Sequence, residues 1–183
     1  MRSTGKKTEI VRKTSELLSL AEDGSEITTR RIAENAGINP AMVNYYFGSK
    51  DGLLKAAVSA MNGDLTSETH HDHAGSRKEM FDILVGICET SIRYTRFGLG
   101  RDAETFSKDA LETSSKLIGM KRAMDEKASD DDPAAMFKIV CFLMAASADP
   151  ERFAEYSGTD IRIKAQLRSL VSRQLDILLG DAL

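Results

Sequence analysis

Apolar residues recur every three or four positions along most of the chain, which is the period of an amphipathic α-helix. From Thr8 to Ala21 they keep to one helical face, and the Glu-Asp-Gly that follows ends the run with a glycine suited to a helix C-terminus. The same spacing predicts a helix within residues 27–38, a short helix from Pro40 to Phe47, and a fourth helix beginning at Lys50. The N-terminal third is therefore expected to be entirely helical.

The remainder of the chain continues this pattern. Helices are predicted over residues 77–97, over 101–128 as one helix or two, from Pro133 to about Ala148, and from about Asp160 to Leu179. Two polar stretches interrupt them, at residues 70–76 and at the acidic run before Pro133. We expect an all-α fold with a small N-terminal domain, residues 1–52, and a larger helical domain, residues 53–183.

The second and third helices carry specific signals at their ends. Thr28 is a suitable N-cap, Gly37 can take the left-handed conformation that turns the chain, and Asn39 caps a helix that has Pro40 at its first position. Two short helices joined by a three- or four-residue turn with a glycine form the helix-turn-helix pattern. The sequence therefore predicts a helix-turn-helix over residues 28–47.

The third helix has one apolar stripe, Val43 and Phe47, and we expect that stripe to pack on the first two helices. Its opposite face would then be exposed and able to contact DNA. An amide there can pair with adenine edges or phosphate, and a tyrosine hydroxyl can donate to phosphate. Small apolar side chains there can touch thymine methyl groups. This face presents Pro40, Ala41, Asn44 and Tyr45, with Met42 and Tyr46 beside it.

Residues 28–54, "TTRRIAENAGINPAMVNYYFGSKDGLL", resemble the TetR family of bacterial transcriptional regulators, and the resemblance covers about the first third of the chain. It implies that the N-terminal domain binds DNA and that the C-terminal domain binds an effector and dimerises. By this resemblance Pro40, Ala41 and Met42 face base edges. Many relatives have an aromatic residue where this chain has Asn44, so Asn44 can contact either phosphate or a base. The residues expected to contact DNA are Thr28, Thr29, Arg30, Asn39, Pro40, Ala41, Met42, Asn44, Tyr45, Tyr46 and Lys50.

Charge is unevenly distributed, although the chain carries a net charge of -3. Residues 1–58 hold nine Lys or Arg against seven Asp or Glu, which leaves the rest of the chain acidic. Arg2, Lys6, Lys7, Arg12 and Lys13 form a basic cluster of the kind that attracts phosphates. A solvated helix face would have the same composition, so the cluster supports nucleic-acid binding without establishing it.

Residues after 77 are rich in Met and Phe, as expected for a helical bundle around an apolar ligand pocket, and an ordinary core would contain the same residues. We expect an unknown, lipophilic small-molecule effector. The residues expected near its pocket are Phe81, Leu84, Cys88, Phe106 and Met120.

The last two predicted helices each carry an apolar seam, and the TetR resemblance implies that they pair with the same helices of a second chain. A seam turned toward the chain's own core would have the same spacing. The residues expected in a homodimer interface are Met136, Ile139, Leu143, Ala146, Ile163, Leu167, Leu170, Gln174 and Ile177.

Other classes of protein fit less well. His70, His71, Asp72 and His73 could ligate a transition metal, but a short polar connection enforces no geometry, so we interpret it as a solvated loop and expect no metal and no cofactor. An enzyme would need a nucleophile or an acid-base pair in a defined setting, which the sequence does not indicate. A purely structural helical module is the remaining alternative. With no signal peptide and no run of 18 apolar residues, we expect a cytoplasmic protein with no membrane partner and reduced cysteines.

Overall fold

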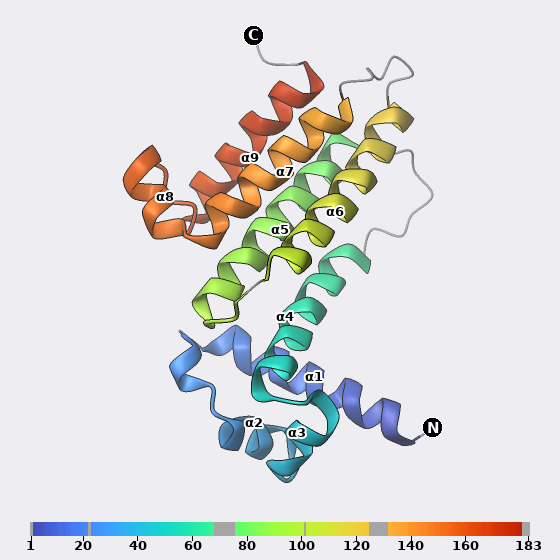
Figure 1. Cartoon of the computed structure of the whole chain (residues 1–183), viewed down its shortest axis with the longest axis vertical. Helices are drawn as coiled ribbons and strands as arrows, with labels where there is room; N and C mark the ends of the chain where they lie inside the picture. Colours follow the sequence, from blue (N-terminus) through green and yellow to red (C-terminus); the bar gives the residue numbers. More distant parts are fainter. Residues whose placement is uncertain (1, 22, 68–75, 101, 125–131, 181–183) are drawn as a thin grey trace. The chain divides into compact units, whose positions relative to one another are not determined.

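The chain folds into α-helices that form two compact units. The computed structural model describes residues 2–21, 23–67, 76–100, 102–124 and 132–180, with the side chains of 2–4 and 62–67 left out (Figure 1). These residues form α-helices and one 3-10 turn and contain no strand, which confirms the all-α prediction. Unit 1 comprises residues 1–68 and 93–100, and unit 2 comprises residues 69–92 and 101–183.

Unit 1 is built on a long first helix. Its elements are α1 (Arg2–Leu20), η1 (Gly24–Glu26), α2 (Thr29–Ala36), α3 (Ala41–Phe47) and α4 (Lys50–Ser67), so α1 begins earlier than the predicted Thr8. The core of the unit joins α1 to α4: Ile10 and Leu18 are buried together with Leu53, Leu54 and Val58. Because α4 supplies Leu53, Leu54, Ala57 and Val58 to this core, unit 1 extends past residue 52, where the sequence predicted a boundary.

Unit 2 is a bundle of long helices. Its elements are α5 (Arg77–Arg96), except for residues 93–96, which belong to unit 1, and α6 (Ala103–Met124), α7 (Asp132–Ala148), α8 (Pro150–Ser157) and α9 (Lys164–Leu179). The α5, α6, α7 and α9 helices run side by side (Figure 1). The segment predicted as one helix or two is the single helix α6. Lys121 of α6 and Asp132 of α7 form an ion pair with a Nζ–Oδ1 distance of 2.7 Å, in which both side chains are nearly buried.

The α8 helix was not predicted from the periodicity of apolar residues. The signals were present: Asp149 caps the helix by accepting a hydrogen bond from the Arg152 N–H at 3.1 Å, Pro150 follows it, and Gly158 ends the helix at a φ of 70°. These eight residues carry too few apolar positions to show a helical period. As a result α9 begins at Lys164 rather than at Asp160.

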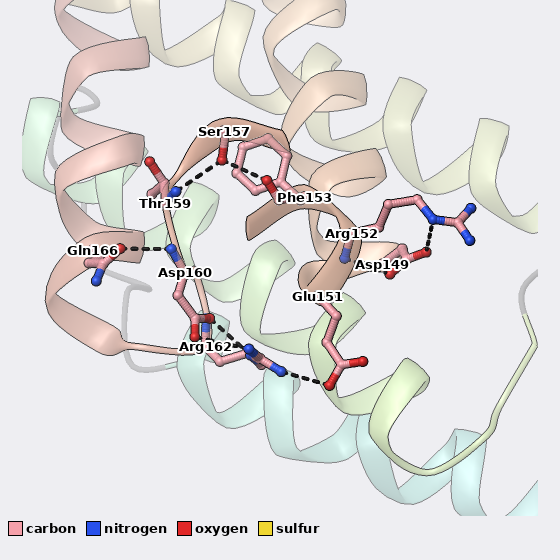
Figure 2. A network of polar contacts seen from close by, with 9 residues as sticks. All are labelled: Asp149, Glu151, Arg152, Phe153, Ser157, Thr159, Asp160, Arg162 and Gln166. Carbon is pink, nitrogen blue, oxygen red and sulfur yellow. Dashed lines mark hydrogen bonds and ion pairs between the residues drawn. The ribbon is translucent and has the colours of Figure 1, made fainter. Parts of the chain in front are cut away.

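A network of polar contacts fixes the connection between α8 and α9 (Figure 2). The Arg162 guanidinium donates to both carboxylate oxygens of Asp160 at 2.9 and 3.0 Å, and to Glu151 of α8 at 2.8 Å. The hydrogen bonds from Arg162 lower the pKa of Asp160. Gln166, in the first turn of α9, accepts from the Asp160 N–H at 2.7 Å. The connection is therefore a defined corner rather than an extended linker.

The apolar seams of α7 and α9 face mainly inward. Met136, Leu143 and Leu167 are at most 2% exposed and belong to the core of unit 2, together with Ile139, Ala146 and Leu170. Their packing partners are other helices of the same chain, so these six side chains are largely buried within unit 2. Of the remaining residues expected in an interface, Gln174 is half-buried, and Ile163 and Ile177 are exposed.

No single helix within the described ranges is long and apolar enough to cross a membrane; α7 and α8 pass together by length and composition alone and are bent by 107° at their junction. The histidine-rich stretch from His70 to His73 lies outside the described residues.

Candidate nucleic-acid interface

The α2 and α3 helices are joined by a tight turn whose hydrogen bonds are all local. Thr28 caps α2 by accepting from the Arg31 N–H at 3.1 Å, as predicted. At the other end Gly37 has a φ of 63°, and the Ile38 N–H donates to the Ala33 carbonyl at 3.0 Å. Asn39 Oδ1 then accepts from the Ala41 N–H at 2.9 Å, and α3 begins at Ala41 with Pro40 at the N-cap, one residue later than predicted. The sequence therefore forms the helix-turn-helix that its capping residues predicted.

The α3 helix buries one side and exposes the other. Val43 is fully buried, and Phe47 is half-buried against the core of unit 1. Pro40, Ala41, Asn44 and Tyr45 are exposed, and Met42 and Tyr46 are half-buried beside them. This is the division between a packed stripe and an open face that the spacing predicted.

Aromatic contacts order the open face of α3. The Tyr45 ring, 78% exposed, meets the Tyr46 ring edge to face at a centroid distance of 5.1 Å. Tyr46 meets Phe47 in the same way at 6.3 Å, and Lys7 Nζ of α1 lies 5.4 Å from the Phe47 ring centroid. The exposed tyrosine is thus supported by rings behind it, which restricts where its hydroxyl can point.

The cationic groups around this face are held in defined places. Lys50 Nζ, at the start of α4, donates to the Ile27 carbonyl at 3.3 Å, one residue before the α2 cap. Arg30 donates to Glu34 at 2.9 Å, and this hydrogen bond raises the pKa of Arg30, which stays charged. Arg31 binds the side chain of Glu26 at 3.2 Å. Exposed pairs of this kind exchange easily for another anion, because water screens them and each contributes little to stability.

Contacts between backbone and side chains tie α1 to the helices that follow. Lys13 Nζ donates to the Asn35 carbonyl at 3.3 Å, while Asn35 Nδ2 donates to the Lys13 carbonyl at 2.9 Å. Ser15 Oγ donates to the Ala57 carbonyl of α4 at 2.9 Å. These bonds hold α2 and α4 against α1 and so fix the orientation of α3.

Only some side chains of the basic cluster predicted on α1 are available to bind an external anion. Arg12 forms a salt bridge with Glu16 one turn later, and Lys13 is used in the contact with α2. Lys7 is exposed, and Lys6 is half-buried. The side chain of Arg2 lies outside the described residues. Lys6 and Lys7 are therefore the members of the cluster best placed for an external phosphate.

Gly52 is a structural requirement of this site that the sequence analysis did not identify. A Cβ at position 52 would lie 2.3 Å from the Phe47 carbonyl oxygen, which is closer than such atoms come in proteins. Ser49 Oγ meanwhile accepts from the Gly52 N–H at 3.0 Å and caps α4. The start of α4 thus abuts the end of α3, and only glycine allows this approach. The available signal was a glycine inside an otherwise helical pattern.

The residues expected near an effector are brought together in unit 2. Leu84 and Cys88 are fully buried in its core, and Phe81, Phe106 and Met120 pack against that core. Burial raises the pKa of the Cys88 thiol to about 12, with a smaller opposing contribution from its hydrogen bond to Ser147. Arg168 lies over the Phe81 ring at 4.6 Å. The cluster is predominantly apolar, with a cation at its edge.

The part of the chain that contains the helix-turn-helix is similar to known proteins. Residues 19–57 match the family described as "Bacterial regulatory proteins, tetR family". The chain is 41% identical over 64 residues to the HTH-type transcriptional regulator BetI of Burkholderia lata, which is 34% of this chain and 33% of that protein. It is 38% identical over 65 residues to the HTH-type transcriptional dual regulator CecR of Shigella flexneri, which is 36% of this chain and 29% of that protein.

These matches span about a third of the length of the curated relatives. The comparison with solved structures found no significant match. The family model covers the C-terminal end of α1, the capped α2, the Gly37 turn, α3 and the start of α4, which are the elements that form the exposed face described above. Residues 19–57 of this all-helical chain are therefore similar to the tetR family of bacterial regulatory proteins, and the similarity covers its helix-turn-helix.

Proposed function

We propose that this protein is a DNA-binding transcriptional regulator that recognises a palindromic operator as a homodimer and is released from it by a small molecule. The observation that carries the DNA-binding part is the open face of α3, where Ala41, Asn44 and Tyr45 are exposed on a helix fixed by the Gly37 turn. A helix presented in this way fits the major groove, which is wide enough to admit it.

The side chains divide by their chemistry into two groups. Tyr45, Tyr46 and Lys50 carry donors that suit phosphate oxygens, and Thr28 keeps a hydroxyl hydrogen to donate while its oxygen caps α2. Pro40, Ala41 and Met42 offer apolar surface for base edges and thymine methyl groups. Asn44, exposed between the groups, can take either role. The face therefore combines positioning contacts with base readout.

The homodimer is proposed through the outer face of α7. The positions Ala134, Phe137, Cys141, Ala145 and Ala148 follow a spacing of three or four and are exposed or half-buried. Phe137 is 37% exposed there, and Ile177 on the neighbouring α9 is 62% exposed. A stripe of small residues with one aromatic lets two helices approach closely around a twofold axis. We propose this exposed surface for the interface in place of the seams predicted from the sequence, because those seams are largely buried within unit 2.

Release by an effector is proposed through unit 2. Its core places Phe81, Phe106 and Met120 at partly buried positions, where an apolar ligand can compete with their packing. Such a ligand weakens DNA binding only if it has different affinities for the two conformations of the protein. A lipophilic or amphipathic molecule fits the apolar character of this cluster.

The test is binding of the purified protein to DNA from upstream of its own gene, measured by gel shift with an unrelated duplex of equal length as control. We expect a specific complex that Tyr45→Ala weakens and Tyr156→Ala does not, since Tyr156 is 91% exposed on α8 in unit 2. Equal affinity for both duplexes at every salt concentration would contradict a sequence-specific regulator and favour a structural module.

A further inference from the structure

Two contacts between long side chains join α5 to α9 within unit 2. Arg77, in the first turn of α5, forms an ion pair with Asp176, in the last turn of α9. One turn further along α5, the Phe81 ring lies under the Arg168 guanidinium, whose central carbon is 4.6 Å from the ring centroid. Because the later residue of α5 meets the earlier residue of α9, the two helices are antiparallel at this place.

Ser172 lies between these two contacts. It is one helical turn after Arg168 and one before Asp176, so the three side chains share one face of α9. Ser172 is half-buried, and its hydroxyl makes no hydrogen bond to a described residue. By contrast, the Ser114 and Ser147 hydroxyls each donate to the carbonyl one turn earlier at 2.7 Å. We call the α5–α9 patch the set Arg77, Phe81, Arg168, Ser172 and Asp176.

The charge of Arg168 is not balanced by any carboxylate in the part of the chain that the structure describes. Arg168 is exposed, and within the described ranges its guanidinium forms no ion pair and donates no hydrogen bond. Arg77, in contrast, is paired with Asp176. The patch thus holds two arginines against one carboxylate and is positively charged. An anion placed between the two helices would meet a cation whose donors are available.

Phe81 connects this cation to the apolar core of unit 2. Its ring is half-buried and packs against that core, and Val85, one turn further along the same face of α5, is buried. An arginine held over an aromatic ring keeps its N–H donors for another acceptor, while the ring stays in contact with apolar side chains. The α5–α9 patch therefore places hydrogen-bond donors beside apolar surface.

We propose that the α5–α9 patch binds an amphipathic carboxylate, with Arg168 and Ser172 donating to the carboxylate oxygens and Phe81 contacting the apolar body. A guanidinium presents parallel N–H groups that match the two oxygens of a carboxylate, and the serine hydroxyl adds another donor. A neutral amphiphile leaves the charge of Arg168 unbalanced, and a cationic one is repelled by it. The inference rests on the proposed function and deepens it, because Phe81 belongs to the cluster proposed for the effector.

The first experiment compares three probes of equal alkyl length. The full chain is titrated calorimetrically with decanoate, decanol and decyltrimethylammonium, each below its micelle concentration. We expect decanoate to bind at least about tenfold more tightly than decyltrimethylammonium, with decanol between them, because only decanoate pairs with Arg168. Binding of the cationic probe that equals or exceeds that of decanoate would overturn the proposal.

The second experiment locates the charge that is recognised. Arg168→Gln removes the charge and keeps most of the length of the side chain, and Arg173→Gln, at an exposed position of the same helix, is the matched control. We expect Arg168→Gln to weaken decanoate binding by about tenfold and to leave decanol binding unchanged, whereas Arg173→Gln changes neither appreciably. Decanoate affinity that is the same in wild type and Arg168→Gln refutes the site.

Two further variants test the remaining contacts. We expect Ser172→Ala to weaken decanoate binding roughly threefold and Ser169→Ala, at an exposed position of α9, to have no effect. Phe81→Leu should weaken decanoate and decanol alike, because it removes apolar contact and no charge. If Phe81→Leu changes neither affinity, the ligand does not lie on this ring and the proposed placement is wrong. Circular dichroism checks that each variant is folded.

The same measurements separate this site from the proposed function. A decanoate preference that depends on Arg168 supports the site whether or not the protein binds DNA. Wild-type protein that binds no DNA would refute the proposed function alone. A protein that binds its operator and shows no Arg168-dependent preference for decanoate would refute the site and leave DNA binding intact.

Discussion

Lys50 Nζ lies 3.3 Å from the carbonyl oxygen of Ile27, so the first residue of α4 holds the backbone that leads into α2. This contact places an ammonium group one residue before the Thr28 cap and beside the N-terminus of α2, where donors for an anion gather. A lysine expected only to bind phosphate thus also positions the helix-turn-helix.

Replacing Lys50 by alanine should weaken binding to every DNA sequence about equally. Loss of one phosphate contact per subunit lowers the magnitude of the slope of log K against log salt by about one, hence by about two per dimer. The lost bond to Ile27 should also reduce the free energy of unfolding by about 1 kcal/mol. Lys55→Ala, an exposed lysine of the same helix, is the control, and an unchanged slope for Lys50→Ala would contradict a phosphate contact.

Replacing Met42 by glutamine should change which base pairs are preferred. Met42 is half-buried at the edge of the open face, so a polar end there alters contacts with base edges by roughly 1–3 kcal/mol at particular positions. The salt slope should stay nearly the same, because no phosphate contact is lost. Binding to single-base-pair variants of the operator measures this. Asn44→Ala in the same assay decides whether Asn44 reads a base or holds a phosphate.

Replacing Gly52 by alanine should destabilise unit 1 strongly. The added carbon would lie 2.3 Å from the Phe47 carbonyl oxygen, so α3 and α4 must separate, at a cost of roughly 1–3 kcal/mol or more. Gly86→Ala is the matched control: it is also within a helix, with no atom within 4 Å of the new carbon, and should stabilise by roughly 0.5–1 kcal/mol. Urea unfolding gives the free energy of unfolding of each variant. Equal stability of the two variants would contradict the close approach of position 52 to the Phe47 carbonyl.

Replacing Phe137 by arginine should dissociate the proposed dimer without unfolding the chain. Phe137 is 37% exposed on the outer stripe of α7, so a charge is tolerated in a monomer and buried in a dimer. Leu111→Arg, at a more exposed position of α6, should leave assembly unchanged. Sedimentation at several concentrations gives the result. A Phe137→Arg protein that remains a dimer would move the interface elsewhere.

The stability of the protein should fall in alkaline solution partly because of Cys88. Burial raises its pKa from 9.0 to about 12, so the unfolded chain loses the thiol proton at lower pH than the folded chain. The contribution of the neutral thiol is therefore complete below pH 9.0 and is lost as the pH rises toward 12, at about 1.4 kcal/mol per pH unit. The difference in the free energy of unfolding between wild type and Cys88→Ala, measured across this window, isolates that contribution. A constant difference would mean that Cys88 is not buried as described.

Short-range signals were sufficient for the helix-turn-helix. Thr28, Gly37 and Asn39 act on backbone groups within a few residues of themselves, so the ends of α2 and α3 follow from the sequence. The open face of α3 follows as well, because its apolar residues Val43 and Phe47 are four positions apart. Periodicity did not predict α8, because its eight residues are too few to show a helical repeat of apolar positions. Its only sequence signals were the cap at Asp149 and the ending at Gly158.

The tertiary structure decided what local patterns left open. Apolar residues cover almost the whole circumference of α7, so periodicity alone did not show whether Met136 and Leu143 or Phe137 and Cys141 face the core. In the folded chain Met136 and Leu143 are fully buried in the core of unit 2, whereas Phe137 is 37% exposed and Cys141 is half-buried. Likewise the need for glycine at position 52 and the burial of Phe97 in unit 1 depend on backbone and side-chain atoms from other elements. The sequence by itself determined the cap and the glycine turn of α2 and the exposed face of α3, because these depend on neighbouring residues. Only the folded chain determined which apolar faces are buried internally and which stay exposed, because that depends on packing between helices.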